Sequence, residues 1–180
     1  MILIMGLAGS GKGTQGKLLA KKLGYQYLST GEFLREYITE ERRERMAAGH
    51  LINDDEMIDI IRDFFGKLDD KNRCILDGFP RSKKQADWLA QQHKLGKVDI
   101  EALIYIEVPK AELIKRLLLR GRHDDNEPAI EKRFEEYSKS TSPIIDAYRK
   151  KGIRIIEVDG HGPVDDIQLK ILDAFNKPSA

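Results

Sequence analysis

The stretch Gly6-Leu-Ala-Gly-Ser-Gly-Lys-Gly-Thr14 follows an apolar N-terminal run and precedes a helical pattern. Its glycines allow several backbone N–H groups to converge on one anion, and the start of the next helix adds partial positive charge. Lys12 is long enough to reach the outer phosphates of a nucleotide. A turn that merely joined a strand to a helix would not require this lysine. We therefore interpret the stretch as a phosphate-binding loop.

Short apolar runs alternate with helical patterns along the chain. Gly24 is expected to cap the first helix, Pro109 to open another, and Asn126 to cap a long helix that Pro143 bends or breaks. Strands that alternate with helices form a mostly parallel sheet covered on both faces. We predict an α/β, three-layer P-loop NTPase fold with a five-stranded parallel sheet. The runs expected to be strands are 1–6, 25–28, 74–77, 103–108 and 153–158.

The composition excludes several classes of protein. The chain has 180 residues, 41% of them hydrophobic and 34% charged, which suits one globular domain rather than a disordered chain. A net charge of +1 gives no general attraction to nucleic acid or to a membrane surface. No apolar run approaches the roughly 20 residues of a membrane span, and the N-terminal run lacks the features of a secretion signal. We expect a cytoplasmic protein.

Cys74 is the only cysteine, so neither an intrachain disulfide nor a thiolate metal cluster can form. It lies in an apolar run, where a buried and inert thiol is expected.

The segment Asp77-Gly-Phe-Pro-Arg81 ends the third apolar run. Asp77-Gly alone would also fit a plain turn. In a chain that carries a phosphate-binding loop, however, a carboxylate at this place can hold Mg²⁺ directly or through water, together with the hydroxyl of Thr14.

Arg116, Arg120, Arg122 and Arg133 flank one short polar loop, and the first two lie one helical turn apart. Arginines often decorate exposed helices. Phosphoryl transfer, however, needs positive charge around the phosphate oxygens, and the planar guanidinium group suits bidentate phosphate contacts. We therefore expect this cluster to have a function at the phosphates rather than to decorate the surface.

With these motifs in order, the chain resembles adenylate kinases from end to end. Gly11-Lys-Gly-Thr-Gln15 is similar to the family's form of the loop, and Ser29–Arg35 to its monophosphate-binding segment. Asp77–Arg81 with Gln85, and Asp159-Gly-His-Gly-Pro-Val164, resemble two further family motifs. The family usually has proline where Ala8 stands, so we expect altered loop rigidity but retained binding. The resemblance implies reversible phosphoryl transfer from Mg-ATP to AMP, which gives two ADP.

The resemblance also implies which residues form the site. Those for ATP are Gly9, Ser10, Gly11, Lys12, Gly13, Thr14, Arg116, Arg120 and Gly162. Those for AMP are Thr30, Arg35, His50, Leu51, Ile52, Gly78, Phe79, Pro80, Arg81, Gln85, Arg122 and Arg133. Catalysis would depend on Lys12, Arg81, Arg120, Arg122 and Arg133, and Mg²⁺ on Thr14 and Asp77. We expect no zinc site, no partner beyond ATP, AMP and ADP, and a monomer.

Two other functions stay open. Relatives that prefer UMP and CMP tend to have alanine at the position of Thr30 and asparagine at that of Gln85, and this chain has neither change. A glutamine amide can both donate to and accept from an adenine edge, so AMP is favoured. The second alternative is a nucleotide-binding regulatory module without turnover, although both phosphate-facing halves of the site are retained.

We predict a single kinase domain over 1–180, with a monophosphate-binding insertion at about 29–58. The family usually places a lid between the positions of Arg120 and Arg122, where this chain has only Gly121. We therefore expect a vestigial lid at about 121–126 and a site that is less sealed from water.

Overall fold

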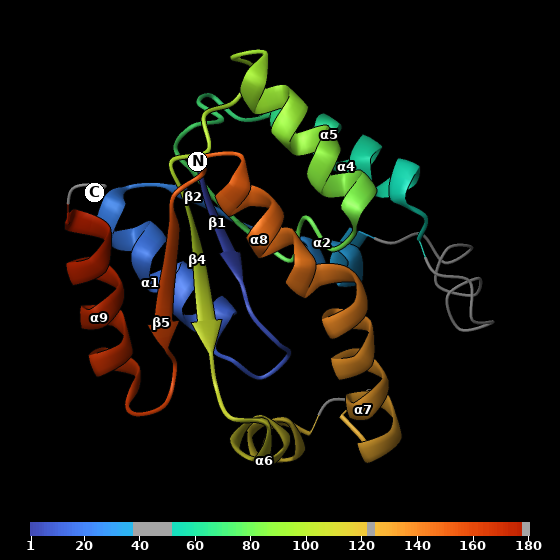
Figure 1. Cartoon of the computed structure of the whole chain (residues 1–180), viewed down its shortest axis with the longest axis vertical. Coiled ribbons are helices and arrows are strands. Elements are labelled where there is room, and N and C mark those ends of the chain that lie inside the picture. The colour runs from blue at the N-terminus through green and yellow to red at the C-terminus, as the bar shows by residue number, and fades with distance from the viewer. Residues whose placement is uncertain (38–51, 122–124, 178–180) are drawn as a thin grey trace.

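A computed structural model describes residues 1–37, 52–121 and 125–177 (Figure 1). In this part of the chain, parallel strands form one five-stranded sheet in the order β2-β3-β1-β4-β5. The predicted fold class is therefore confirmed. The strands are β1 (Ile2–Met5), β2 (Gln26–Ser29), β3 (Cys74–Asp77), β4 (Ala102–Glu107) and β5 (Ile155–Asp159).

Both faces of the sheet are buried, which explains why its central strands are almost continuously apolar. Successive side chains of β1 point to opposite faces, so Leu3 and Met5 belong to one core cluster and Ile2 and Ile4 to another. All four are at most 4% exposed.

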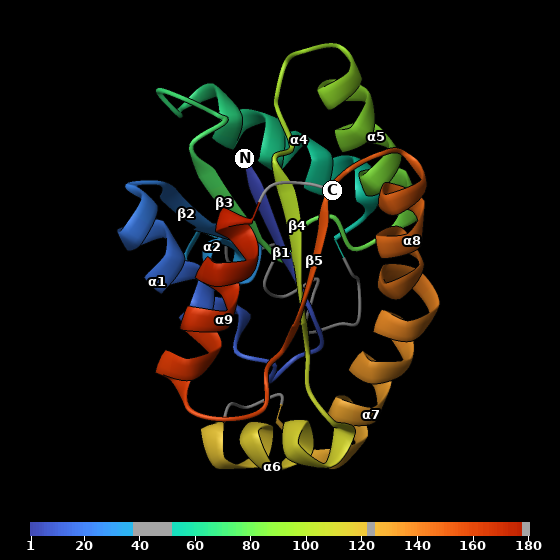
Figure 2. The same ribbon diagram turned by 60° about the vertical axis from the view of Figure 1, so that its left-hand side comes forward.

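Helices cover the two faces (Figures 1 and 2). On one face lie α1 (Lys12–Leu23) and α9 (Val164–Asn176), and on the other α4 (Asp54–Gly66), α5 (Lys83–Lys94) and α8 (Ser142–Lys150). The helix α6 (Lys110–Arg120) lies across the carboxyl ends of the strands, next to α7 (Glu127–Glu136). The short helix α2 (Thr30–Tyr37) follows β2 directly. Loops at the carboxyl edge of a parallel sheet are the usual place for a ligand.

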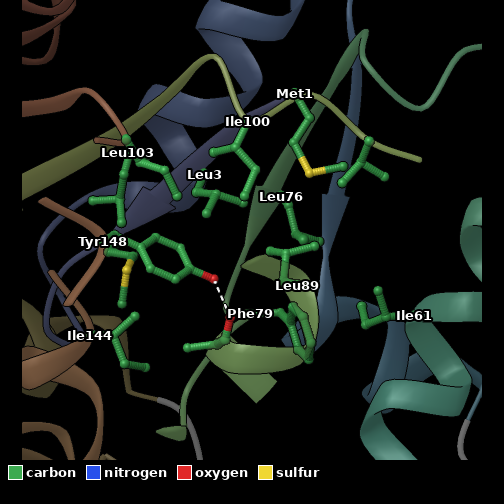
Figure 3. Close-up of a cluster of buried hydrophobic side chains, with 14 of the residues drawn as sticks. Met1, Leu3, Ile61, Leu76, Phe79, Leu89, Ile100, Leu103, Ile144 and Tyr148 are labelled. Atoms are coloured by element: carbon green, nitrogen blue, oxygen red, sulfur yellow. Dashed lines mark hydrogen bonds between the residues drawn. The ribbon is translucent and has the colours of Figure 1, made fainter. Parts of the chain in front are cut away.

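The core on the α5 and α8 face is closed by a buried tyrosine (Figure 3). Tyr148 is 0% exposed, and its hydroxyl donates a hydrogen bond of 3.0 Å to the backbone carbonyl of Ala86. This bond joins α8 to α5 and satisfies a hydroxyl that would otherwise be buried without a partner. Cys74 is buried as expected, and burial raises the pKa of its thiol to about 12.

The predicted helix ends are largely confirmed. Gly24 caps α1 in the left-handed conformation, with φ of 66°, and the Asn126 side chain accepts a hydrogen bond from the backbone N–H of Ala129. The expected long helix after Asn126 is divided, because α7 continues as a π-helical segment, Tyr137–Thr141, before α8 begins. Pro143 lies in the first turn of α8, directly after this π-helical segment.

Parts of two predicted segments, 38–51 of the insertion and 122–124 of the vestigial lid, lie outside the described residues. Within the described ranges, every helix falls short of the length and apolarity needed to cross a bilayer.

Candidate active site

The phosphate-binding loop joins β1 to α1 as predicted. The backbone N–H of Ser10 donates to the carbonyl of Leu7 at 3.1 Å, which folds the loop back on itself. Gly11, at the start of α1, has a φ of 92°, a conformation that favours glycine, and a side chain added there would meet only open space. The space beside Gly11 at the start of α1 is therefore open. Ala8, at the position where proline was expected, packs against the α6–α7 cluster.

Lys12 lies in this loop and is affected by charged side chains from other elements of the site. Its Nζ donates a hydrogen bond of 2.8 Å to the Leu7 carbonyl. Burial lowers the pKa of the ammonium group to about 8, while Asp77 raises it and Arg81 and Arg120 lower it further. The charges of Asp77, Arg81 and Arg120 are therefore near enough to Lys12 to act on its pKa.

Asp77 ends β3 and is 8% exposed. Its Oδ2 accepts a hydrogen bond of 2.8 Å from the hydroxyl of Tyr27, and a Cβ on Gly13 would lie 3.9 Å from the same oxygen. Burial, and then the charge of Asp77, raise the pKa of the Tyr27 phenol, so the phenol stays protonated and donates. Asp77 thus faces the first turn of α1.

The donor set at this place fits Mg²⁺. A carboxylate, from Asp77, and a hydroxyl, from the exposed Thr14, supply the hard oxygen ligands that Mg²⁺ prefers. Among residues 1–37, 52–121 and 125–177, no three His, Cys, Asp or Glu side chains form a metal cage. A Mg²⁺ ion held here would therefore complete its coordination shell with water and phosphate oxygens, as it commonly does.

The predicted acceptor residues meet where β2 and β3 end. Thr30 is 3% exposed, and its hydroxyl donates to the backbone carbonyl of Asp77 at 3.2 Å. A Cβ on Gly78 would lie 2.5 Å from Thr30 Oγ1 and 2.9 Å from Arg81 Nη2, so these three residues are in contact. Arg81 Nε in turn donates to the Gly78 carbonyl at 2.8 Å.

Gln85 lies beside this group, in the first turn of α5. Its Oε1 accepts a hydrogen bond from the Arg81 backbone N–H, and its Nε2 donates one to Asp54 Oδ1, both at 2.8 Å. These bonds use one lone pair and one N–H of the amide and leave one of each for a ligand. Two other predicted AMP residues, Phe79 and Pro80, are buried, and the Phe79 ring packs edge-on against Trp88 within the core.

The arginine cluster is held together by one acidic side chain. Arg120 donates from Nε and Nη2 to the two carboxylate oxygens of Asp125, at 2.8 and 2.7 Å. Arg133 Nη2 donates to Asp125 Oδ1 at 2.9 Å. The Asp125 side chain is 0% exposed, so α6 and α7 are joined by a buried carboxylate between two cations.

Arg116, another arginine of the predicted cluster, contacts the late loop rather than Asp125. Its Nη1 and Nη2 both donate to the backbone carbonyl of Gly160, at 3.2 Å, and its Nε donates to Glu112 Oε1 at 2.9 Å. The predicted late loop, which includes the exposed Gly162, is thus attached to α6. The far end of that loop is attached to α1, because Gln15 Nε2 donates to the Val164 carbonyl at 2.9 Å.

Other predicted site residues are placed only in part. Ile52 is half-buried just before α4, and Arg35 is described only by its backbone in α2. His50, Leu51 and Arg122 lie outside the described residues.

Sequence reasoning missed two side chains, Tyr27 and Asp54. The alternation of β2 places Tyr27 on the same face as Ser29, and this signal could have been used. Asp54 offered no such signal, because its contact with Gln85 depends on how α4 and α5 pack.

A parallel sheet with a phosphate-binding loop after its first strand, and with lysine, arginine and aspartate around one space, defines a P-loop protein suited to phosphoryl transfer. The sequence model of the family described as adenylate kinase matches residues 4–153. An adenylate kinase of Corynebacterium urealyticum is 35% identical over 182 residues, which cover 98% of this chain and 99% of that protein. One of Leptospira biflexa is 38% identical, with 97% and 98% covered, and one of Thermus thermophilus 35%, with 97% and 96%. The chain belongs to the adenylate kinase family.

Proposed function

We propose that the protein catalyses reversible phosphoryl transfer from Mg-ATP to AMP, which gives two ADP. Family membership over nearly the whole chain supports this activity. The structural observation that carries it is the arrangement at the carboxyl edge of the sheet, where Lys12 starts α1 and Asp77, followed by Gly78 and Arg81, ends β3 with its carboxylate facing the first turn of α1. Lys12 comes from the ATP loop and Arg81 from the acceptor motif, so positive charge from both halves converges on the space where a phosphoryl group would move.

The residues act on this group through charge and position, and no side chain needs to form a covalent intermediate. Lys12 exchanges its hydrogen bond to Leu7 for contacts with the outer phosphate oxygens. The N–H groups at the start of α1 surround the same phosphates. Arg120, Arg133 and Arg81 stabilise the charge that spreads over the equatorial oxygens, and Arg122 is assigned the same task from the sequence.

Thr14 and Asp77 would hold the Mg²⁺ that accompanies ATP. When bound, this ion neutralises phosphate charge. Asp77 then has two tasks, since it also opposes the charge of the partly buried Lys12.

The acceptor pocket is proposed to select AMP. Thr30, Gly78, Arg81 and Gln85 lie together, and the amide of Gln85 retains one donor and one acceptor that match the edge of adenine. Arg35 and the backbone of 50–52 complete the pocket in this proposal. The insertion at about 29–58 and the vestigial lid at about 121–126 belong to the same proposal, as do a monomeric state and a cytoplasmic location.

An initial-rate screen of AMP, UMP, CMP and GMP, each with ATP and with GTP, tests the proposal. The pair ATP and AMP should react fastest. Equal or faster use of UMP or CMP would move the protein to the UMP/CMP kinases. No ADP formation by folded, ATP-binding protein would instead support a regulatory module without turnover.

A further inference from the structure

Tyr27 makes a contact that the proposed mechanism does not use. In the parallel register of β2 and β3, Tyr27 pairs with Ile75 and Ser29 with Asp77. Because side chains alternate along a strand, Tyr27 and Asp77 extend to the same face of the sheet, the face covered by α1. The tyrosine is long enough to reach this diagonal neighbour, and its hydroxyl donates to Asp77 Oδ2 at 2.8 Å.

The sequence of α1 leaves room for this ring. A Cβ on Gly16 would lie 2.6 Å from Cε2 of Tyr27, and a Cβ on Gly13 would lie 3.5 Å from its hydroxyl oxygen. Glycine inside a helix is unfavourable relative to alanine. The Tyr27 ring explains why glycine stands at position 16, because it leaves no room for a side chain there. Lys17 Nζ lies 5.6 Å from the centre of the same ring. Packing therefore fixes the place from which the hydroxyl donates.

We propose that Tyr27 is a positioning residue for phosphoryl transfer, which fixes the Asp77 carboxylate relative to the metal ion of the nucleotide. The inference rests on the proposed function, because it takes Asp77 as the residue that holds Mg²⁺. The hydrogen bond engages Oδ2 and leaves Oδ1 for the ion or its water. Without the bond, the carboxylate can rotate and is drawn toward the positive charge of Lys12. Partners of this kind orient a ligand without touching the metal ion.

The test compares Tyr27→Phe with a matched control, Tyr25→Phe. Tyr25 also carries a bonded hydroxyl, but that group contacts Glu101 Oε2 at 3.3 Å, at the opposite end of β2 from Asp77. Two quantities are measured: the affinity for ATP in EDTA, and the affinity of the ATP-bound enzyme for Mn²⁺ by electron paramagnetic resonance. Tyr27→Phe should leave the first unchanged and weaken the second about threefold to tenfold, as expected for one lost hydrogen bond. Tyr25→Phe should leave both unchanged.

A second variant tests whether the place of the Tyr27 ring matters, and not only the presence of its hydroxyl. Gly16→Ala keeps every polar group but crowds the ring, so it should weaken Mn²⁺ binding in the same direction as Tyr27→Phe. Circular dichroism checks that the variant folds. Wild-type Mn²⁺ affinity in Tyr27→Phe would overturn the inference.

Asp77→Asn shows which of the two ideas has failed. If it weakens Mn²⁺ binding while Tyr27→Phe does not, only the role of Tyr27 is wrong. If Asp77→Asn also binds Mn²⁺ normally, the metal assignment in the proposed function is wrong, and the inference falls with it. An equal loss of ATP affinity in EDTA and with Mn²⁺ in Tyr27→Phe would mean a structural role for the tyrosine, and would also overturn the inference.

Discussion

Replacing Asp125 by alanine should destabilise the protein markedly. The carboxylate is fully buried and accepts three hydrogen bonds from two guanidinium groups. Removal of one partner of a buried ion pair costs about 3–5 kcal/mol. Here the side chains of Arg120 and Arg133 are 33% and 26% exposed, so water can hydrate part of the charge that is left. We therefore expect a loss of about 2–3 kcal/mol, below the range for a fully buried pair.

For a chain of this size, a loss of this magnitude should lower the Tm by about 4–12 °C. Thermal unfolding followed by circular dichroism measures it. A saturating concentration of ATP should raise the Tm of Asp125→Ala more than that of the wild type, because phosphates can replace the missing negative charge between the arginines.

Asp87→Ala is the matched control. Asp87 also binds two cations, Lys83 and Lys151, but its side chain is 47% exposed. Exposed ion pairs contribute only about 0–1 kcal/mol each, so the Tm should change little. If Asp125→Ala unfolds no earlier than Asp87→Ala, or gains no additional protection from ATP, then Asp125 does not hold the arginines as described.

Four further predictions concern the reaction. Because burial lowers the pKa of Lys12 to about 8, its ammonium charge is present below that pH and is lost above it. The affinity for ATP should therefore fall about tenfold between pH 7 and pH 9. Lys12→Arg, which stays charged over this range, should remove the pH dependence. Lys12→Ala should lower kcat by about two or more orders of magnitude. Near-normal turnover of the folded variant would show that Lys12 is not a catalytic residue. The double change Thr30→Ala with Gln85→Asn should shift relative kcat/KM from AMP toward UMP or CMP by about 1–3 kcal/mol per lost contact; a wild type that already uses UMP or CMP as well as AMP refutes this. Finally, with only Gly121 between the two arginines of the predicted lid, ATP hydrolysis without AMP should be measurable. Undetectable hydrolysis, together with a large backbone displacement of 121–126 on binding a bisubstrate inhibitor, would show a working lid instead.

The fold was predictable because its signals are local. The phosphate-binding loop carries its glycines and lysine within one short stretch, and the central strands are mostly apolar runs. Gly24 and Asn126 mark helix ends through their own backbone and side-chain chemistry. These features need no knowledge of what packs against them, and the structure has them where the sequence indicates.

The contacts between side chains at the site were less predictable. The sequence places Asp125 within the expected lid at about 121–126, whereas its bond to Arg133 depends on how α6 and α7 pack. Tyr27 reaches Asp77 only because β2 pairs with β3, and Gln85 meets Asp54 only because α4 packs beside α5. Each contact joins residues that lie far apart in sequence or on separate helices, so tertiary packing decides it.

The late loop, 159–164, is hydrogen-bonded at its two ends to two different helices. Arg116 of α6 holds the Gly160 carbonyl, and Gln15 of α1 holds that of Val164. A loop fixed in this way cannot swing as an independent flap. It forms a fixed rim whose place is set by α1 and α6 together. Displacement of α6, which carries Arg116 and Arg120 on successive turns, would therefore shift this rim and the Arg120 side chain in the same movement.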